Sequence, residues 1–322
     1  MLVIQDAWQH EDFPRPTVVT VGNFDGIHSG QLLVLERVRE RADAIGATAV
    51  VVTFEPHPLV VLRPQRHPQR ITTPEQKQEL IRLLGMDLMA IIDFTPEFST
   101  TPATWFVEDL LHRRLGAAEI YIGSDFAFGH QRGGNLDLLR SMAGRLGFQV
   151  EGIPELNSDG SAISSTRIRQ AVREGEVSRA AQMLGRPFAI TGVVVRGEGK
   201  GRVHGWPTLN VQTDHELLPA DGVYAAQVWL PEQSQTLGAV TNVGRRPTFP
   251  NGGQRVVEAH LFDFDGDLYG ERVELGFVKR LRGERRFPSV ENLTSQIGKD
   301  AQLAREYLAR KDCSTLVPTL KI

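Results

Sequence analysis

One stretch constrains the fold more than any other part of the chain. It covers residues 21–31 and reads Val-Gly-Asn-Phe-Asp-Gly-Ile-His-Ser-Gly-Gln. The apolar, β-branched run 17–21 leads into it, and apolar residues at three- and four-residue steps leave it as far as Gly46. The stretch is therefore predicted to be a turn from a strand into a helix. In an open parallel sheet such a turn lies at the carboxyl end of the strand, where ligands bind.

The turn carries groups that suit an anion. Gly22, Gly26 and Gly30 let backbone come close to a ligand, and N–H groups at the start of a helix attract negative charge. His28 can donate a hydrogen bond to a phosphate oxygen. An ordinary strand-to-helix loop with a surface histidine would use the same residues, and spacing alone leaves both interpretations open.

Strand and helix patterns alternate through the first half of the chain, which predicts a parallel α/β sheet. The expected strands are 17–21, 48–54, 88–94, 119–122 and 148–153, and the expected helices between them are 74–84, 102–115 and 136–146. Two more short helices, 165–174 and 177–184, end at Gly185-Arg186-Pro187. Glycine followed by proline is a stop signal, so we predict two domains, 1–185 and 186–322.

The second half is rich in short β-runs separated by Gly- and Pro-containing turns. These runs are 188–196, 208–212, 222–230, 236–243, 256–264 and 272–282. The pattern predicts a small antiparallel barrel, and 290–308 is predicted to be one helix packed on it.

Two loops after predicted strands of the first domain could contact a ligand. The segment 53–58, Thr-Phe-Glu-Pro-His-Pro, places His57 beside the first turn because its prolines fix the chain direction. The Gly-rich segment 123–134 offers a carboxylate, two aromatic rings and a guanidinium, which suit a flat heterocycle. A proline-stiffened loop and a glycine loop without a ligand would have the same compositions.

The run Ile-Ser-Ser-Thr-Arg-Ile-Arg at 163–169 starts a predicted helix with three hydroxylated residues. Capping explains one hydroxyl, and capping alone is the structural interpretation. Arg169 lies one turn beyond Ser165 on the same helix face, so the turn also suits ATP phosphates. The segment 70–77, in contrast, is interpreted as a plain helix start with Thr73 as its N-cap.

The second domain contains three candidate features. Glycines 197, 199 and 201 with Lys200 form either a hairpin loop or a cationic flap for phosphates. Thr208 and Asn210 are two residues apart in a strand, so they share a face and offer oxygen ligands for Mg²⁺, while Leu209 points away. Glu258 is a lone carboxylate in an apolar strand, which is costly unless it has an ion-pair partner or a task.

Several of these segments resemble one family. The turn at 22–31 is similar to the signature of the HxGH nucleotidyltransferases, in the branch that adenylylates FMN, although Gln31 stands where that family has its second histidine. The run 163–169 matches their Ile-Ser-Ser-Thr-x-x-Arg pattern. In the second domain, Pro-Thr-Leu-Asn at 207–210 resembles the Pro-Thr-Ala-Asn of riboflavin kinases. The chain is thus identified by resemblance as a member of the bacterial bifunctional riboflavin kinase/FMN adenylyltransferases, also called FAD synthetases.

The resemblance implies a Rossmann-like nucleotidyltransferase domain, a riboflavin kinase-like barrel with a C-terminal helix, and synthesis of FAD from riboflavin through FMN. It implies Glu258 as the catalytic base of the kinase, and His28 and Arg169 as catalytic groups of the adenylyltransferase. For the adenylyltransferase it implies an ATP site of Gly22, Phe24, Asp25, His28, Gln31, Ser164, Ser165, Thr166 and Arg169, and a flavin site of His57, Asp125, Phe128 and Arg132. For the kinase it implies an ATP site of Gly197, Gly199, Lys200, Gly201, Thr208 and Asn210, the last two also holding Mg²⁺. The rival hypothesis, which Gln31 supports, is a kinase whose first domain binds flavin or nucleotide without turnover.

Composition narrows the function classes. The net charge is −3, so neither nucleic acid nor an anionic membrane is an expected partner. Cys313 is the only cysteine, which excludes an intramolecular disulfide and a cysteine-cluster metal site. Neither a Walker-type phosphate loop nor a Gly-x-Gly-x-x-Gly fingerprint occurs. We expect a cytoplasmic enzyme with the small-molecule partners riboflavin, FMN and ATP. Its oligomeric state stays open between a monomer and weak self-association.

Overall fold

The computed structural model describes the whole chain except residues 198–204, 246–254, 311–312, 314, 316 and 320–322. The chain divides into two compact units. The first comprises Met1–Pro68 and Lys77–Ile163, and the second comprises Gln69–Gln76 and Ser164–Ile322. The short segment 69–76 therefore belongs by its contacts to the second unit, although its neighbours in the sequence belong to the first.

The first unit is built on a six-stranded sheet, and the predicted parallel α/β fold is confirmed. The strands pair in parallel in the order β1-β4-β3-β2-β5-β6. They are β1 (Leu2–Ile4), β2 (Thr17–Val21), β3 (Thr48–Glu55), β4 (Leu88–Asp93), β5 (Ala117–Gly123) and β6 (Gln149–Ile153). The order reverses between β2 and β5, so the carboxyl ends of these two strands flank a topological switch point.

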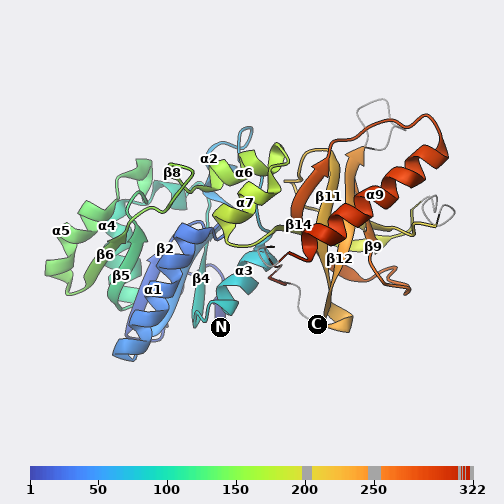
Figure 1. Ribbon diagram of the computed structural model, residues 1–322. Coiled ribbons are helices and arrows are strands. Elements are labelled where there is room, and N and C mark those ends of the chain that lie inside the picture. The colour runs from blue at the N-terminus through green and yellow to red at the C-terminus, as the bar shows by residue number, and fades with distance from the viewer. Residues whose placement is uncertain (198–204, 246–254, 311–312, 314, 316, 320–322) are drawn as a thin grey trace. The chain divides into compact units, whose positions relative to one another are not determined.

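Helices cover both faces of this sheet. Alternate residues of a strand point to opposite faces, so Val51 packs with α1 (Ser29–Ile45) and α3 (Pro74–Leu83), whereas Val50 and Val52 pack with η2 (Phe106–Arg114) and α5 (Leu136–Leu146). Figure 1 shows α1 running along the sheet beside β2. Burial on both faces explains why these strands read as continuous apolar runs.

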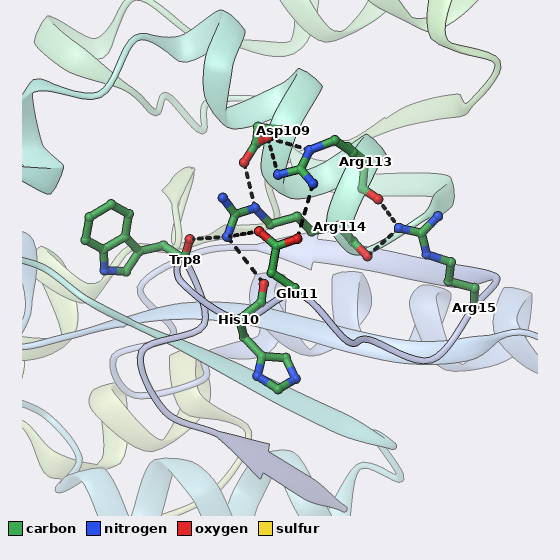
Figure 2. Close-up of polar contacts among 7 residues, drawn as sticks. All are labelled: Trp8, His10, Glu11, Arg15, Asp109, Arg113 and Arg114. Atoms are coloured by element: carbon green, nitrogen blue, oxygen red, sulfur yellow. Dashed lines mark hydrogen bonds and ion pairs between the residues drawn. The ribbon is translucent and has the colours of Figure 1, made fainter.

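The segment before β2 is fixed to the end of η2, a π-helix that continues α4 (Ala103–Trp105) (Figure 2). Arg15 donates to the carbonyls of Arg113 and Arg114, which are among the last of that helix. Asp109 accepts from both Arg113 and Arg114, at 2.6 Å in each case. The bonds from Arg15 satisfy carbonyl groups that a helix end otherwise leaves open. The predicted helix 102–115 is thus present, with a wider turn over most of its length.

The second unit is a closed antiparallel barrel, as predicted, with strand order β10-β13-β12-β11-β14-β9. Its strands are β9 (Phe188–Val195), β10 (Leu209–Gln212), β11 (Gly222–Leu230), β12 (Gln235–Arg245), β13 (Arg255–Leu261) and β14 (Arg272–Arg282). The helix α9 (Val290–Leu308) lies across β11, β12 and β14 (Figure 1). Ala301 and Ala304 of α9 pack on Val240 and Phe262, which marks the outer face of the barrel.

Two helices that precede the barrel in sequence also belong to this unit: α6 (Ser165–Arg173) and α7 (Val177–Leu184). The helix α7 packs on β9 and β14. The remaining short elements are α2 (Pro58–Leu62), η1 (Phe98–Thr100), η3 (His130–Arg132), β7 (Asn157–Ser158), β8 (Ser161–Ala162) and η4 (Pro231–Gln233).

Candidate functional sites

The loop between β2 and α1 is held in an unusual conformation at the switch point. Phe24 and Ile27 adopt positive φ angles of 47° and 43°, and both side chains are buried. A β-branched residue such as Ile27 rarely takes this conformation. The loop is tied to β3, because Gly22 N donates to the Val52 carbonyl at 3.0 Å and Thr53 Oγ1 to the Asn23 carbonyl at 3.3 Å. Strain that the surrounding structure enforces in this way is typical of functional loops.

His28 and Gln31 hold each other at the first turn of α1. The backbone N–H of Gln31 donates to His28 Nδ1 at 3.4 Å, and the backbone N–H of His28 donates to Gln31 Oε1 at 3.2 Å. Since Nδ1 accepts, the proton of the neutral imidazole is on Nε2. The carboxamide oxygen of Gln31 is engaged by the cap, which leaves its NH₂ group as the end suited to a ligand. The first turn of α1 contains no acidic residue, in keeping with an anion site.

The carboxyl end of β3 lies next to this loop, because β3 pairs with β2 in parallel. His57 follows β3 and caps α2, with Nδ1 accepting from the Leu59 N–H at 3.1 Å. Lys77 brings a buried ammonium group to the same strand end. It donates to Glu55 Oε2 at 3.3 Å and to the Phe54 carbonyl at 3.5 Å.

The loop after β5 lies on the other side of β2. Asp125 and Arg132 are exposed on it, whereas Phe128 is buried against Phe106, with ring centroids 5.4 Å apart. Gly134 permits this packing, since a Cβ there would come within 2.5 Å of the Phe128 ring. The topology therefore brings the loops that carry His28, His57, Asp125 and Arg132 to one edge of the sheet.

The Ile-Ser-Ser-Thr run lies in the second unit, at the start of α6. Ser164 is the N-cap, and its hydroxyl accepts from the Arg167 N–H at 3.4 Å. Capping thus uses one hydroxyl, as the sequence predicts, while Ser165 and Thr166 occupy the first turn. Arg169 is buried, and its Nε donates to the Gln69 carbonyl at 2.7 Å. That bond fixes the guanidinium group to the segment 69–76.

A row of polar side chains crosses three strands of the barrel. Glu258 of β13 is paired with Asn210 of β10 on one side and with Asn242 of β12 on the other. Paired residues share a face, and this face is the outer one, since His260 on the same side of β13 is paired with Val240 under α9. Leu209 is paired with Ala259 on the opposite face, which confirms that it points away from the row.

The backbone of Gly197 lies directly against Asn210. A Cβ at position 197 would be 2.2 Å from Asn210 Nδ2, so any other residue there would displace the Asn210 carboxamide. Thr208 precedes β10 on the side of His260, whose Nδ1 lies 2.8 Å from the Pro207 carbonyl. Gly199, Lys200 and Gly201, which the sequence also assigns to this site, lie outside the described residues.

Comparison with known proteins connects both sites to known chemistry. The sequence profile of the FAD synthetases matches residues 10–167, and that of the riboflavin kinases matches residues 184–308. The bifunctional riboflavin kinase/FMN adenylyltransferase of Pseudomonas fluorescens is 38% identical to this chain over 295 residues, which are 92% of this chain and 94% of the relative. The corresponding protein of Escherichia coli K12 is 36% identical over 290 residues, 90% of this chain and 92% of the relative. The chain belongs to this family.

A solved structure also matches this fold, and the match includes both units. The crystal structure of a macrolide-efflux protein from Streptococcus pneumoniae covers 95% of this chain and 100% of its own, with a TM-score of 0.87 and 31% sequence identity. In the part of the chain that the structure describes, none of the helices combines the length and apolarity needed to cross a membrane.

Two residues that lie beside the candidate sites were not among the predicted site residues. Lys77 was interpreted as part of a plain helix start, although it is the only lysine before residue 200, a rarity that points to a specific position. Asn242 was recognised only as part of a family-like segment. Its pairing with Glu258 depends on the register of β12 and β13, which a single sequence does not give.

Proposed function

We propose that the chain makes FAD from riboflavin in two steps that each consume ATP. In the first step ATP phosphorylates riboflavin, giving FMN and ADP. In the second step FMN is adenylylated by another ATP, giving FAD and pyrophosphate. The observation that carries the proposal is that the two candidate sites, at the sheet edge and on the outer face of the barrel, each fall within one matched family region.

In the kinase step the nucleophile is the terminal ribityl hydroxyl, which is weak until it loses its proton. Glu258 is suited to accept that proton as the oxygen attacks the γ-phosphorus of ATP, and a general base of this kind contributes about 10²–10⁴-fold to the rate. Thr208 and Asn210 would hold Mg²⁺, because hydroxyl and carboxamide oxygens fit a hard cation that takes its other ligands from phosphates. When bound, the ion orients the phosphates and offsets their charge. Gly197 would lie under the same phosphates, with Gly199, Lys200 and Gly201.

In the adenylyltransferase step the nucleophile is the phosphate of FMN, which is already an anion, so no base is needed. Catalysis then rests on placing two polyanions and stabilising the charge that develops on them. The start of α1 offers N–H groups, and His28 can donate from Nε2 because its Nδ1 accepts from Gln31. Ser165, Thr166 and Arg169 would bind phosphate oxygens of ATP. Gly22, Phe24, Asp25, Gln31 and Ser164 would complete the nucleotide site, and His57, Asp125, Phe128 and Arg132 the flavin site.

We assign the adenylyltransferase to residues 1–185 and the kinase to 186–322. The division into compact units places α6 in the same unit as the barrel. Because its Ile-Ser-Ser-Thr run matches the nucleotidyltransferase pattern, we nevertheless assign α6 to the adenylyltransferase activity. We propose that the enzyme works in the cytoplasm, where ATP is abundant, with Mg²⁺ as its metal and small molecules as its partners. The alternative, a first domain without turnover, is not favoured, since the matched relatives are named for both activities.

The substitution Glu258→Gln tests the assignment of the kinase base. It replaces the carboxylate by an amide of nearly equal volume, so we expect FMN formation to fall by about 10²-fold or more, while FAD formation from supplied FMN persists. The matched control is Glu232→Gln, which makes the same change at an exposed position between β11 and β12. Riboflavin, ATP and Mg²⁺ are incubated with each protein, and FMN, FAD and pyrophosphate are separated by chromatography. If the parent protein produces FMN but no FAD, the second step of the proposal is wrong.

A further inference from the structure

Gln69 connects the helix α6 with the loop between β10 and β11. Its side-chain Nε2 donates to the Glu216 carbonyl at 2.6 Å, and its Oε1 accepts from Arg173 Nε at 3.1 Å. Its backbone carbonyl accepts from Arg169 Nε at 2.7 Å. Gln69, α6 and this loop all belong to the second unit. The proposed function uses Arg169 and gives Gln69 no role.

The loop that receives the Gln69 side chain is anchored on the barrel. Glu216 is exposed, but it lies between His215 and Leu217, which are both buried. His215 Nε2 accepts from the Thr191 N–H of β9 at 3.1 Å. The Glu216 carbonyl, which accepts from Gln69, is therefore held in place by its two buried neighbours.

Both polar groups of the peptide unit that joins Gln69 to Arg70 are engaged. The Gln69 carbonyl accepts from Arg169, and the Arg70 N–H donates to Glu216 Oε2 at 3.4 Å. The Arg70 side chain forms an ion pair with the same carboxylate, with its Nε 3.7 Å from Oε1. The Gln69 carbonyl therefore has a fixed direction as well as a fixed position.

A fixed carbonyl restrains the plane of the Arg169 guanidinium group. This group is planar and binds phosphate oxygens well only when its fork of N–H donors points at them. Arg169 is buried, and its bond to Gln69 uses Nε, so that bond restrains the direction of the two terminal nitrogens. A donor that is oriented in advance stabilises developing charge without the cost of reorganisation.

We propose that Gln69 is a positioning residue of the adenylyltransferase: anchored by Glu216 and Arg173, its carbonyl directs the Arg169 guanidinium group toward the ATP phosphates. This inference rests on the proposed role of Arg169. Gln69 acts through Arg169 and touches neither substrate. The inference concerns adenylyl transfer alone, and FMN formation does not depend on it.

Substitutions of the side chains that anchor the carbonyl test the proposal. Gln69→Met keeps the approximate length without a donor or an acceptor, so the KM for ATP in FAD formation should rise about fivefold to tenfold, while the KM for FMN stays within about twofold. A merely destabilised protein would instead lose kcat with both KM values unchanged. Glu216→Met should raise the KM for ATP by a smaller factor, and Glu216→Gln, which keeps an acceptor for the Arg70 N–H, should restore the parent value. The matched control is Gln65→Met, the same change at an exposed position, which should have no effect.

A double-mutant cycle with Arg169→Met tests whether Gln69 acts through Arg169. Methionine keeps an apolar stem in place of the arginine stem, so the packing is largely preserved. In that background Gln69→Met should change kcat/KM for ATP by less than about twofold, because the group that it positions is absent. FMN formation from riboflavin, measured on every variant, confirms that the second unit is folded.

The outcomes separate the inference from the proposed function. A further fivefold to tenfold loss from Gln69→Met in the Arg169→Met background would overturn the inference, as would an unchanged KM for ATP in Gln69→Met alone. If Arg169→Met slows FAD formation and Gln69→Met does not, Arg169 keeps its proposed role and only the role of Gln69 is wrong. If Arg169→Met makes FAD as fast as the parent, the proposed role of Arg169 itself is wrong.

Discussion

At the start of α1 two side chains each have two possible tasks. His28 accepts from the backbone of Gln31 through Nδ1, and Gln31 accepts from the backbone of His28 through Oε1. Each residue therefore stabilises the helix with one end and offers a donor with the other, Nε2–H in His28 and NH₂ in Gln31. Only imidazole can also become cationic near neutral pH, so Gln31 gives up a charge that the family's second histidine could carry. We propose that Gln31 contacts the β- or γ-phosphate of ATP.

Substitutions of Gln31 separate its two tasks. Gln31→Glu keeps the capping oxygen but replaces the donor by a negative charge, so FAD formation should slow while stability holds. Gln31→Ala removes both tasks, so it should slow FAD formation and also lower the free energy of unfolding by about 1 kcal/mol or less. Gln31→His should be tolerated or mildly faster. Steady-state formation of FAD from FMN and ATP, with urea unfolding of each variant, measures both effects.

Among the substitutions at the start of α1, His28→Ala should cause the largest loss of FAD formation. Removing a donor aimed at charge in the transition state costs about 2.7–4 kcal/mol, or about 10²–10³-fold in rate, and the loss at Gln31 should be smaller than that at His28. FMN formation from riboflavin should be the same in all these variants and is the internal control. If His28→Ala makes FAD as fast as the parent, the loop at residues 22–28 is structural, and the adenylyltransferase site lies elsewhere.

Among the elements, those whose pattern repeats over one or more turns could be predicted from the sequence. The helices 136–146, 177–184 and 290–308 have the expected bounds because caps and apolar spacing agree there. The N-cap Thr73 is also confirmed, since its hydroxyl accepts from the Gln76 N–H at 3.2 Å. The strand β1 was missed because three residues show no period. The π-helix at 106–114 was read as an ordinary helix, because apolar spacing does not distinguish the two turns.

The residues of the candidate sites also separate into those whose placement the sequence predicts and those whose placement it does not. The positions of loop residues such as His28 and Arg132 at strand ends could be predicted because glycines, prolines and hydroxyl runs mark turns in the sequence itself. The neighbours of Asn242 and Lys77 could not be predicted, because they lie far away in the chain: Glu258 across a strand pair, and Glu55 at a strand end. The periodicity of a single sequence gives the face of each strand but not the strand that lies beside it.

A buried histidine in the loop between β10 and β11 should make the stability of the fold depend on pH. His215 is 9% exposed, and its Nε2 accepts from the Thr191 N–H at 3.1 Å. Burial, assisted by the charge of Arg70, lowers the pKa of His215 to about 4. The unfolded chain then binds a proton near pH 6.5 that the folded chain takes up only near pH 4, so stability falls as the pH drops through this window, by about 2 kcal/mol at pH 5.

His215→Gln keeps an acceptor for Thr191 without a titratable ring. Its urea-unfolding free energy should therefore lose about 2 kcal/mol less than that of the parent between pH 7.5 and pH 5. Arg70→Gln should reduce the difference by a smaller amount, since it removes the charge that adds to the effect of burial. An identical pH dependence in the parent and in His215→Gln would mean that other groups govern the acid sensitivity.

At the scale of the molecule, one buried carboxylate connects distant parts of the second unit. Glu274 of β14 is 1% exposed and accepts from Gln76 Nε2 at 3.3 Å and from Thr319 Oγ1 at 2.8 Å. Burial lowers the pKa of Arg186 to about 10, and the nearby Glu274 carboxylate opposes that lowering. The unit is therefore held together by chain from before, within and after the barrel, and its stability should depend on where the chain is cut.

Fragments that begin at different residues test this dependence. The row Asn210, Glu258 and Asn242 lies wholly within 187–322, so this fragment should retain the kinase site. It lacks Arg186, however, and a carboxylate that loses its partner inside a protein costs about 3–5 kcal/mol if it stays buried. It also lacks α7, whose Val177, Met183 and Leu184 are buried on the unit. We therefore expect the fragment 164–322, which keeps both, to have a Tm higher than that of 187–322 by about 10 °C or more.

One substitution, made in both fragments, separates the contribution of Arg186 from that of α7. Glu274→Gln removes the charge that needs Arg186, so 187–322 carrying it should recover part of the lost stability, whereas 164–322 carrying it should lose some, because Arg186 is then the unpaired charge. The fragment 1–185 should make FAD from supplied FMN, though more weakly than the full chain, because its segment 69–76 and α6 lack the barrel. Scanning calorimetry of the four kinase fragments, with FMN formation by each, gives the answer. Equal Tm values for 164–322 and 187–322 would mean that the barrel is a self-sufficient unit and that the contacts around Glu274 contribute nothing to it.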